Sequence, residues 1–298
     1  MKRNIIVVGS INTDLVIHAP RMPQKGETLS GSGFFTAHGG KGANQAVAAA
    51  RAGGSVCMCG CVGADAFGES AVSALVAEGI RPEVRRVENI PSGTAVIAVT
   101  GGDNRIILDS GANALLSEED IDRVLAGAKE GDIYLTQLEN PVGIVGYGMR
   151  RAKEKGMFVI LNPAPADGKI ADYLAWCDLL IPNETEAEIL NADGKLEKMY
   201  SGALIVTLGD KGFALKQDGV IQTYACPKVK AVDTTAAGDT FCGALAAKLA
   251  EGCDLLAAAR FGSAAASLAC TGKGAQPSIP RVEQVEKFLA EPARGGMI

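Results

Sequence analysis

Apolar residues follow two different periods along this chain, and the changes between them outline its secondary structure. Short apolar runs bounded by polar residues or glycine are typical of strands, whereas longer stretches with apolar residues three and four positions apart are typical of helices. The pattern predicts strands over residues 4–9, 55–62, 132–138, 157–161, 178–181 and 203–208. It predicts helices over residues 44–52, 66–78, 117–128, 141–155, 184–191, 238–251, 254–271 and 282–289. Because strands and helices alternate, we expect an α/β protein with a three-layer αβα fold and a mostly parallel central sheet.

Two stretches, residues 11–37 and 91–110, do not fit this alternation. The first contains two prolines and several glycines, and the second has two alternating apolar runs around a Gly-Gly-Asp-Asn turn, which is typical of a β-hairpin. We therefore expect a small antiparallel β lid, inserted into a single domain that spans residues 1–298 and placed over the edge of the main sheet. Because the lid has two apolar faces to cover, we also expect it to pair with a second subunit in a homodimer.

The composition narrows the choice of partners. Apolar residues make up 47% of the 298 residues and charged residues 21%, which fits a soluble globular protein. The net charge of −5, with no basic cluster, gives no reason to expect a nucleic acid. No apolar run approaches the roughly 18 residues that cross a membrane, and the first apolar run is too short for a secretory signal. We expect a cytoplasmic protein.

Eight cysteines raise the question of a metal site or disulfides. Cys57, Cys59 and Cys61 alternate, which places all three on one face of a predicted strand. Zinc ligands usually come as spaced cysteine pairs or with histidines, and the two histidines, His18 and His38, are far away in the sequence. We interpret the cysteines as buried free thiols and assign no metal–thiolate site.

Residues 233–240, Asp-Thr-Thr-Ala-Ala-Gly-Asp-Thr, combine two carboxylates with very small residues at the start of a predicted helix. Small residues let the backbone approach a ligand closely, and the first N–H groups of a helix have no partner within it. These groups and the helix dipole favour an anion such as a phosphate. Asp239 at the mouth of such a site suits a general base for phosphoryl transfer. An ordinary helix start, with Asp239 favouring the dipole, would explain the same residues if they stood alone.

Residues 37–46, Ala-His-Gly-Gly-Lys-Gly-Ala-Asn-Gln-Ala, lead from the expected lid into a helix. Their spacing matches neither the dinucleotide-binding fingerprint nor the P-loop. Three glycines around Lys41 indicate a backbone held close to something small and polar, and Asn44 is suited to sugar hydroxyls. A glycine-rich helix start with a solvated Lys41 explains the pattern equally well.

Together, residues 39–46 and 233–240 resemble the two signature motifs of the ribokinase-like (PfkB) carbohydrate kinases. Residues 9–14, 162–165, 182–188 and 273–278 resemble four further motifs of that family in the same order. The resemblance covers nearly the whole chain, and six ordered motifs are far more specific than any one of them. Within the family, the ribokinase group is the most similar.

The resemblance implies that a sugar lies between the lid and the main sheet, with ATP along the carboxyl edge of the sheet. The sugar would be held by Asn12, Asp14, Gly40, Lys41, Gly42, Asn44, Glu139 and Asp239. Glu139 follows a predicted strand, and a carboxylate can accept hydrogen bonds from two neighbouring hydroxyls. An acid at a helix start is the other interpretation of Glu139.

The resemblance also implies a mechanism. Asp239 would take the proton of the primary hydroxyl of the sugar as that hydroxyl attacks the γ-phosphate, and the N–H groups of Ala236, Ala237 and Gly238 would form an anion hole. In the ribokinase group this reaction is the ATP-dependent phosphorylation of D-ribose at its 5-hydroxyl. The alternatives are a kinase of the same fold for deoxyribose, a ketohexose or a nucleoside, and a non-catalytic sugar sensor, against which the presence of Asp239 argues.

A nucleotide site and two metal sites are implied in the same way. The nucleotide would contact Asn183, Glu186, Thr207, Gly209, Lys211, Gly212, Gly238 and Ser263, with Glu186 linked to Mg²⁺ through water. A monovalent cation, K⁺, would be held mostly by backbone oxygens at Asp233, Thr235, Ala269, Gly272, Gly274 and Ser278. From the residues alone, Asn183 and Glu186 would be a helix cap and a solvated acid.

Three features depart from the family pattern. His38 stands where a hydrophobic or aromatic residue is usual, and we expect it to alter the floor of the sugar pocket. Ser263 stands where ribokinases often place a histidine against adenine. The segment 189–204 is shorter than expected, which would remove part of a peripheral helix near the nucleotide.

Overall fold

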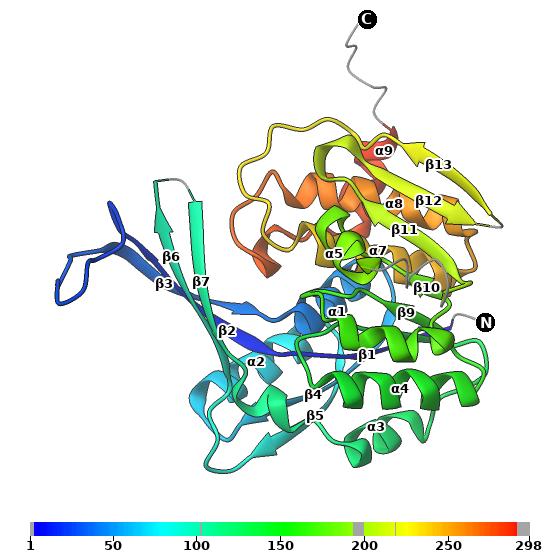
Figure 1. Cartoon of the computed structure of the whole chain (residues 1–298), viewed down its shortest axis with the longest axis horizontal. Coiled ribbons are helices and arrows are strands. Elements are labelled where there is room, and N and C mark those ends of the chain that lie inside the picture. The colour runs from blue at the N-terminus through cyan, green and yellow to red at the C-terminus, as the bar shows by residue number, and fades with distance from the viewer. Residues whose placement is uncertain (1–2, 102, 193–199, 218, 291–298) are drawn as a thin grey trace, which may run out of the picture.

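The computed structural model describes residues 3–101, 103–192, 200–217 and 219–290, and its centre is a nine-stranded sheet (Figure 1). Across the sheet the order is β13-β12-β11-β10-β9-β8-β1-β4-β5. The strands are β1 (Asn4–Val8), β4 (Ser55–Gly63), β5 (Arg81–Val87), β8 (Ile133–Thr136), β9 (Phe158–Leu161), β10 (Leu179–Leu180), β11 (Ala203–Thr207), β12 (Phe213–Gln217) and β13 (Val220–Tyr224). All neighbours from β11 to β5 are parallel, and β12 and β13 extend the sheet in antiparallel fashion.

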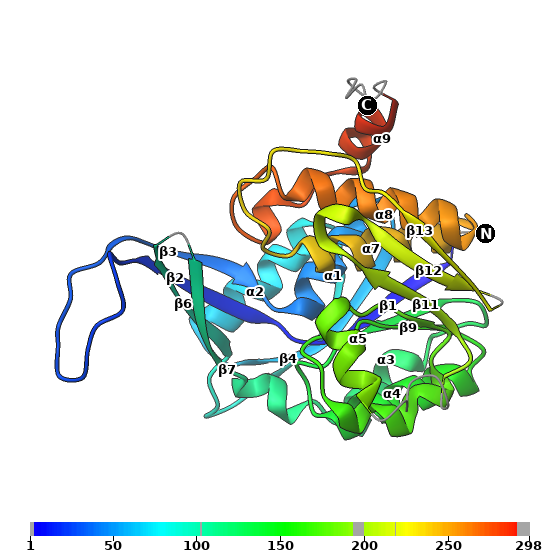
Figure 2. The ribbon, with the colours of Figure 1, turned by 45° about the horizontal axis from the view of Figure 1, so that its top comes forward.

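Helices cover both faces of this sheet, as the αβα prediction requires (Figures 1 and 2). One apolar core lies under α1 (Lys41–Arg51), α2 (Ala66–Ala77), α7 (Ala237–Glu251), α8 (Leu255–Ala269) and α9 (Val282–Ala290). A second core lies on the opposite face, under α3 (Glu118–Leu125), α4 (Val142–Glu154) and the end of α5 (Glu184–Leu190). Short 3₁₀ segments span Gly111–Leu115, Gly168–Trp176, Gly209–Lys211 and Gln276–Ser278. Within the described ranges no helix is both long and apolar enough to cross a membrane.

A separate four-stranded sheet forms the expected lid and projects from the main body (Figures 1 and 2). It has the order β3-β2-β6-β7 and consists of β2 (Asn12–His18), β3 (Ser32–Gly39), β6 (Gly93–Thr100) and β7 (Asp103–Asp109). The prediction of an antiparallel lid was wrong for its central pair, because β2 and β6 run parallel. Both strands follow a parallel strand of the main sheet, β1 and β5, and therefore leave the same edge in the same direction.

The packing of α1 against α7 brings the two signature segments together. A Cβ atom on Gly243 of α7 would lie 2.3 Å from the carbonyl oxygen of Gln45 in α1, so only glycine allows this approach. Alanine dominates the rest of the contact, with Ala46, Ala49 and Ala246 fully buried. Small residues thus let the backbones lie close, and the amino ends of both helices face the same edge of the sheet (Figure 1).

The cysteines of β4 lie on one face of the sheet, as predicted. Cys57, Cys59 and Cys61 are buried in the core beneath α3. Burial, followed by the charge of the nearby Asp120, raises the pKa of the Cys61 thiol to about 12. These thiols stay protonated and pack as small apolar groups.

Candidate active site

Three cavities meet at the amino end of α7, and Thr234 lines all of them. The largest, about 580 Å³, lies beneath the lid and is lined by Asp14 at one end. A second, about 300 Å³, lies between the turn after β11 and α8. A third, about 230 Å³, joins the two and is lined by Lys41 and Asp239. The arrangement suits two ligands that meet at Asp239.

The turn before α7 has an unusual backbone. Ala236, the residue before the helix, has a φ of 59°, a left-handed conformation that costs a residue with a side chain about 1 kcal/mol. It turns the chain sharply into the helix start, where the N–H of Ala237 donates to the Thr234 carbonyl at 3.2 Å. Within the described part of the chain, the N–H groups of Ala236 and Gly238 have no acceptor. Two of the three expected anion-hole donors are therefore free for a ligand, and the third is weakly engaged.

Asp239 is 6% exposed and is held by two neighbouring side chains of α1. Asn44 donates from Nδ2 to Oδ2 of Asp239, and Gln45 donates from Nε2 to Oδ1, both at 3.0 Å. Each carboxylate oxygen keeps a second lone pair for another donor. The carboxylate is therefore fixed in orientation and still able to accept a proton.

Glu139 connects residues 9–14 with residues 39–46. Its Oε2 accepts from Ser10 Oγ at 2.5 Å, from the Lys41 N–H at 3.1 Å and from Asn12 Nδ2 at 3.5 Å. All three donors reach the same oxygen, which leaves Oε1 for a ligand. Asn113 in turn donates from Nδ2 to Oδ1 of Asn12 at 2.7 Å, so the Asn12 amide is oriented as well.

Glycines let residues 39–46 lie in contact with residues 9–14. Gly40 has a φ of 87°, and a Cβ there would lie 2.7 Å from the Asn12 nitrogen. A Cβ on Gly42 would lie 2.6 Å from the Ser10 nitrogen, and one on Gly39 would lie 2.4 Å from the Asp14 carboxylate. Any side chain at these positions would separate the residues that surround Glu139.

Three carboxylates and one ammonium group set the electrostatics. Burial, together with the charges of Glu139 and Asp239, raises the pKa of Asp14 to about 6. The charge of Asp239 raises the pKa of Lys41 against the effect of burial, with help from Glu139 and Glu186. Lys41 therefore remains positive and lies in the joining cavity rather than beneath the lid, on the phosphate side of the expected sugar site.

Asn183 and Glu186 form the helix cap that their residue types predict. They form a reciprocal cap on α5, in which each backbone N–H donates to the other side chain at 2.8 Å. Both also line the joining cavity. Burial raises the pKa of Glu186, and the nearby Lys41 opposes this effect. A carboxylate fixed in this way fits a water-mediated contact with Mg²⁺.

The second cavity is lined by most of the residues predicted to contact the nucleotide. Thr207, Gly209, Gly212, Gly238 and Ser263 line it, together with apolar groups such as Phe241, Val229 and Ala266. Ser263 leaves room there without offering an aromatic ring. Lys211 does not line this cavity, and its ammonium faces Glu184 at 3.8 Å, so its contact with a nucleotide stays a prediction.

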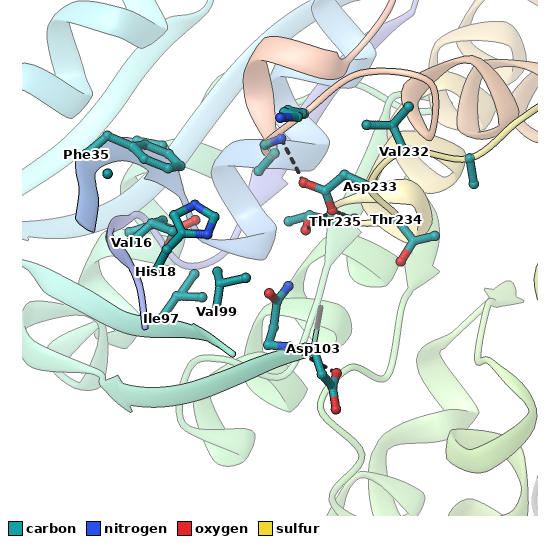
Figure 3. A pocket seen from close by; sticks show the side chains of 18 residues that line it. Val16, His18, Phe35, Ile97, Val99, Asp103, Val232, Asp233, Thr234 and Thr235 are labelled. Atoms are coloured by element: carbon teal, nitrogen blue, oxygen red, sulfur yellow. Dashed lines mark hydrogen bonds between the residues drawn. The ribbon is translucent and has the colours of Figure 1, made fainter. Parts of the chain in front are cut away.

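Asp233 links two loops on the wall of the lid cavity opposite Val16, Phe35, Ile97 and Val99 (Figure 3). Its Oδ1 accepts from the N–H and hydroxyl of Thr235, and its Oδ2 accepts from the N–H of Gly274 at 2.9 Å. Burial opposes ionisation, but these hydrogen bonds outweigh it and lower the pKa of Asp233.

Two other expected cation ligands, Gly272 and Ser278, lie close to each other. The Gly272 N–H donates to the Ala269 carbonyl at 3.1 Å, and the Ser278 hydroxyl donates to the Ala275 carbonyl at 2.9 Å. A Cβ on Gly272 would lie 2.8 Å from Cβ of Ser278. The structure thus brings Gly272 against Ser278 and Gly274 against Asp233, and the monovalent cation at these residues stays a prediction.

His38 does not form the floor of the sugar pocket. In the lid it pairs with Thr13, whereas Asp14 pairs with Ala37. Neighbouring residues of a strand point to opposite faces, so His38 lies on the face away from Asp14 and does not line the lid cavity. Of the shortened segment 189–204, residues 193–199 lie outside the described residues.

Four buried polar residues were not singled out from the sequence: Ser10, Gln45, Asn113 and Gln137. Each binds a predicted site residue or a neighbour of one. Gln45 stands inside a signature segment, and a glutamine on the alanine-rich face of a helix was the one signal that could have marked it.

Comparisons with known proteins show which family the chain resembles. The model of the pfkB family of carbohydrate kinases matches residues 2–282. Ribokinase of Haemophilus influenzae is 40% identical over 97% of this chain and 99% of its own length. Deoxyribokinase of Salmonella typhi is 37% identical over 96% of this chain and 99% of its own. The structure of Arabidopsis thaliana ribokinase with ribose and ATP is 34% identical and has a TM-score of 0.86, covering 98% of this chain and 100% of that one.

The chain therefore belongs to the pfkB family of carbohydrate kinases. It is a sugar kinase of the ribokinase type, and the fold is the ribokinase-like one.

Proposed function

We propose that this kinase transfers the γ-phosphate of ATP to the 5-hydroxyl of D-ribose and produces ribose 5-phosphate. The observation that carries the proposal is the buried Asp239, fixed by α1 at the point where the lid cavity meets the cavity at the start of α7. The similarity to a ribokinase solved with ribose and ATP supports the choice of both substrates.

Sugar hydroxyls would bind to polar atoms that have no hydrogen-bond partner or that keep a free lone pair. Oδ1 of Asn44 is buried and without a hydrogen bond among the described residues, which is costly unless a ligand supplies a donor. Oε1 of Glu139 and the carboxylate of Asp14 add acceptors on the same side. Gly40 and Gly42 keep the backbone close to these acceptors, and Asn12 presents its amide beside Glu139.

Asp239 acts as the general base. The 5-oxygen of ribose forms a bond to the γ-phosphorus, the bond from this phosphorus to the bridging oxygen of ADP breaks, and the hydroxyl proton passes to Asp239. The N–H groups of Ala236, Ala237 and Gly238 and the ammonium of Lys41 stabilise the charge on the transferring group. These groups are fixed before the substrates arrive.

The nucleotide and its metal ions fit the remaining residues. The adenine would lie against the apolar lining of the second cavity near Ser263, and the phosphates would point toward Gly238. Mg²⁺, held through water by Glu186 beside Asn183, supplies positive charge to the phosphates when it is bound. K⁺, held at Asp233 and at backbone oxygens near Ala269 and Ser278, would fix the loop that carries the anion hole.

We also propose that residues 1–298 act as one kinase domain and that its lid forms a homodimer. The lid carries unusually exposed apolar side chains, with Phe34 63%, Ile106 60% and Ile107 71% exposed. Large exposed apolar side chains of this kind are typical of an interface. Light scattering should give twice the chain mass, and a monomer at micromolar concentration would refute the interface.

A screen that couples ADP release to NADH oxidation tests the function. Ribose, deoxyribose, fructose and adenosine are offered at equal concentration with ATP and Mg²⁺. We expect ribose to give the highest kcat/KM. The similarity to a deoxyribokinase makes deoxyribose the second candidate, and a higher kcat/KM for deoxyribose would replace the proposal. No ADP release with any of the four would refute a kinase for these substrates.

A further inference from the structure

Gln45 stands at the centre of a chain of buried amides that ends on Asp239. Its side chain is 0% exposed. Nε2 of Gln45 donates to Oδ1 of Asp239 and to Oδ1 of Asn162, both at 3.0 Å. Its Oε1 accepts from Nε2 of Gln137 at 2.6 Å. Every polar atom of the Gln45 side chain is therefore used, and none is left for a substrate.

The orientation of the Gln45 amide is determined by a backbone carbonyl at the far end of this chain. Nδ2 of Asn162 donates to the Ile181 oxygen at 2.8 Å. A carbonyl oxygen only accepts, so the Asn162 amide must turn its nitrogen to Ile181 and its oxygen to Gln45. Gln45 then presents its own nitrogen both to Asn162 and to Asp239. The reverse orientation would put an oxygen against two oxygens in a buried site, which is strongly unfavourable.

We propose that Gln45 is a positioning residue for the reaction: it holds the Asp239 side chain in the rotamer that accepts the substrate proton, without touching either substrate. Its neighbour Asn44 differs, because the unpaired Oδ1 of Asn44 is available to the sugar. Neither residue lines the three cavities, but the polar atoms of Gln45 are all engaged within the protein. The inference rests on the proposed function, since it assumes that Asp239 is the base.

Two substitutions separate positioning from mere packing. Gln45→Met keeps the length of the side chain and removes the donor, so Asp239 loses one of its two fixed hydrogen bonds. A misplaced catalytic group costs on the order of 100-fold in rate, so we expect kcat to fall by roughly 10- to 100-fold. Because Gln45 does not contact ribose, the Kd of ribose from calorimetry should change by less than about 3-fold.

Gln45→Glu keeps the shape of the side chain and places a second carboxyl group within hydrogen-bonding distance of Asp239. Two buried carboxyls this close share a proton at neutral pH. The pH at which kcat is half-maximal should therefore rise by about one unit or more. An unshifted profile would show that the side chain at position 45 does not act on the Asp239 carboxyl group. Ile121→Val, which removes one buried methyl group of α3 from the second core, is the control for a small loss of stability.

The outcomes are distinct. A wild-type kcat in Gln45→Met, or a loss of ribose affinity as large as the loss of kcat, would overturn the positioning role. If Gln45→Met does not fold, the pH profile of Gln45→Glu decides, and an unshifted profile overturns the proposal. An inactive wild-type enzyme with ribose and ATP would refute the proposed function instead, before any variant is compared.

Discussion

Asp14 lies at the proposed sugar site, where burial disfavours its charged form, and replacing it with asparagine should stabilise the protein. Its pKa is raised from 3.8 to about 6 because it is buried beside Glu139 and Asp239. The folded state therefore binds the proton more tightly than the unfolded state, and the free energy of unfolding falls as the pH rises from about 4 to 6. Above pH 7 the whole penalty applies.

The size of the effect follows from the change in pKa. A difference of about two units corresponds to roughly 2–3 kcal/mol, since each unit is worth about 1.4 kcal/mol. Asp14→Asn removes the charge with little change of shape, so at pH 8 it should raise the free energy of unfolding by about that amount. For a chain of this size the midpoint of thermal unfolding should rise by roughly 3–5 °C. At pH 5 the gain should shrink to about half.

Ribose binding should weaken in the same variant. A hydrogen bond to a charged acceptor contributes about 1.5–3 kcal/mol, so the Kd of ribose should rise by roughly 10- to 100-fold. Thermal unfolding at pH 5 and pH 8, with calorimetry at pH 8, measures both effects. Asp172→Asn, at an exposed aspartate far from the site, is the control. A variant that is less stable than the wild type at pH 8, or equally stabilised at both pH values, would refute the reasoning.

Two further predictions concern stability and the cation. Burial favours the neutral form of Asp120, but hydrogen bonds from Arg85 and Arg123 outweigh it and lower its pKa to about 2. The stability from these contacts is present above pH 4 and is lost as the pH falls toward 2. Asp120→Asn should therefore lower the free energy of unfolding by roughly 2–3 kcal/mol at pH 7. An unchanged midpoint of urea unfolding would contradict this. Phosphorylation of ribose should be faster in KCl than in NaCl at equal ionic strength, and Asp233→Asn should reduce the difference; equal rates in the two salts for the wild type would count against the cation site.

The sequence predicted the central strands and the helices that cover them better than the strands at the edges of the main sheet. Predicted strands in the middle of the sheet were confirmed, because buried parallel strands are continuous apolar runs. β5 was missed because it is an edge strand with arginines at positions 81, 85 and 86, and such a pattern is also typical of a loop. β12 and β13 were missed because β12 ends in Lys216 and Gln217 and β13 is an edge strand that is exposed along most of its length.

In the site, motifs identified the residue types but not their partners. The hydrogen bond from Asn44 to Asp239 joins residues 195 positions apart, and no local pattern shows such a contact. The face on which His38 lies depends on strand pairing in the lid, and a shift of one residue would have reversed it. Lys211 belongs to a matching turn, yet its side chain turns outward to Glu184.

The most direct test of the account is Asp239→Asn. Asparagine keeps the shape of the side chain and part of its hydrogen bonding but cannot take a proton from the sugar. Ribose 5-phosphate formation is followed by ³¹P NMR with ATP and Mg²⁺, and ribose binding is measured by calorimetry on the same sample. We predict that the variant binds ribose with a Kd near that of the wild type and loses roughly 10²–10⁴-fold in turnover. A variant that retains most of the wild-type turnover would contradict the assignment of Asp239 as the base.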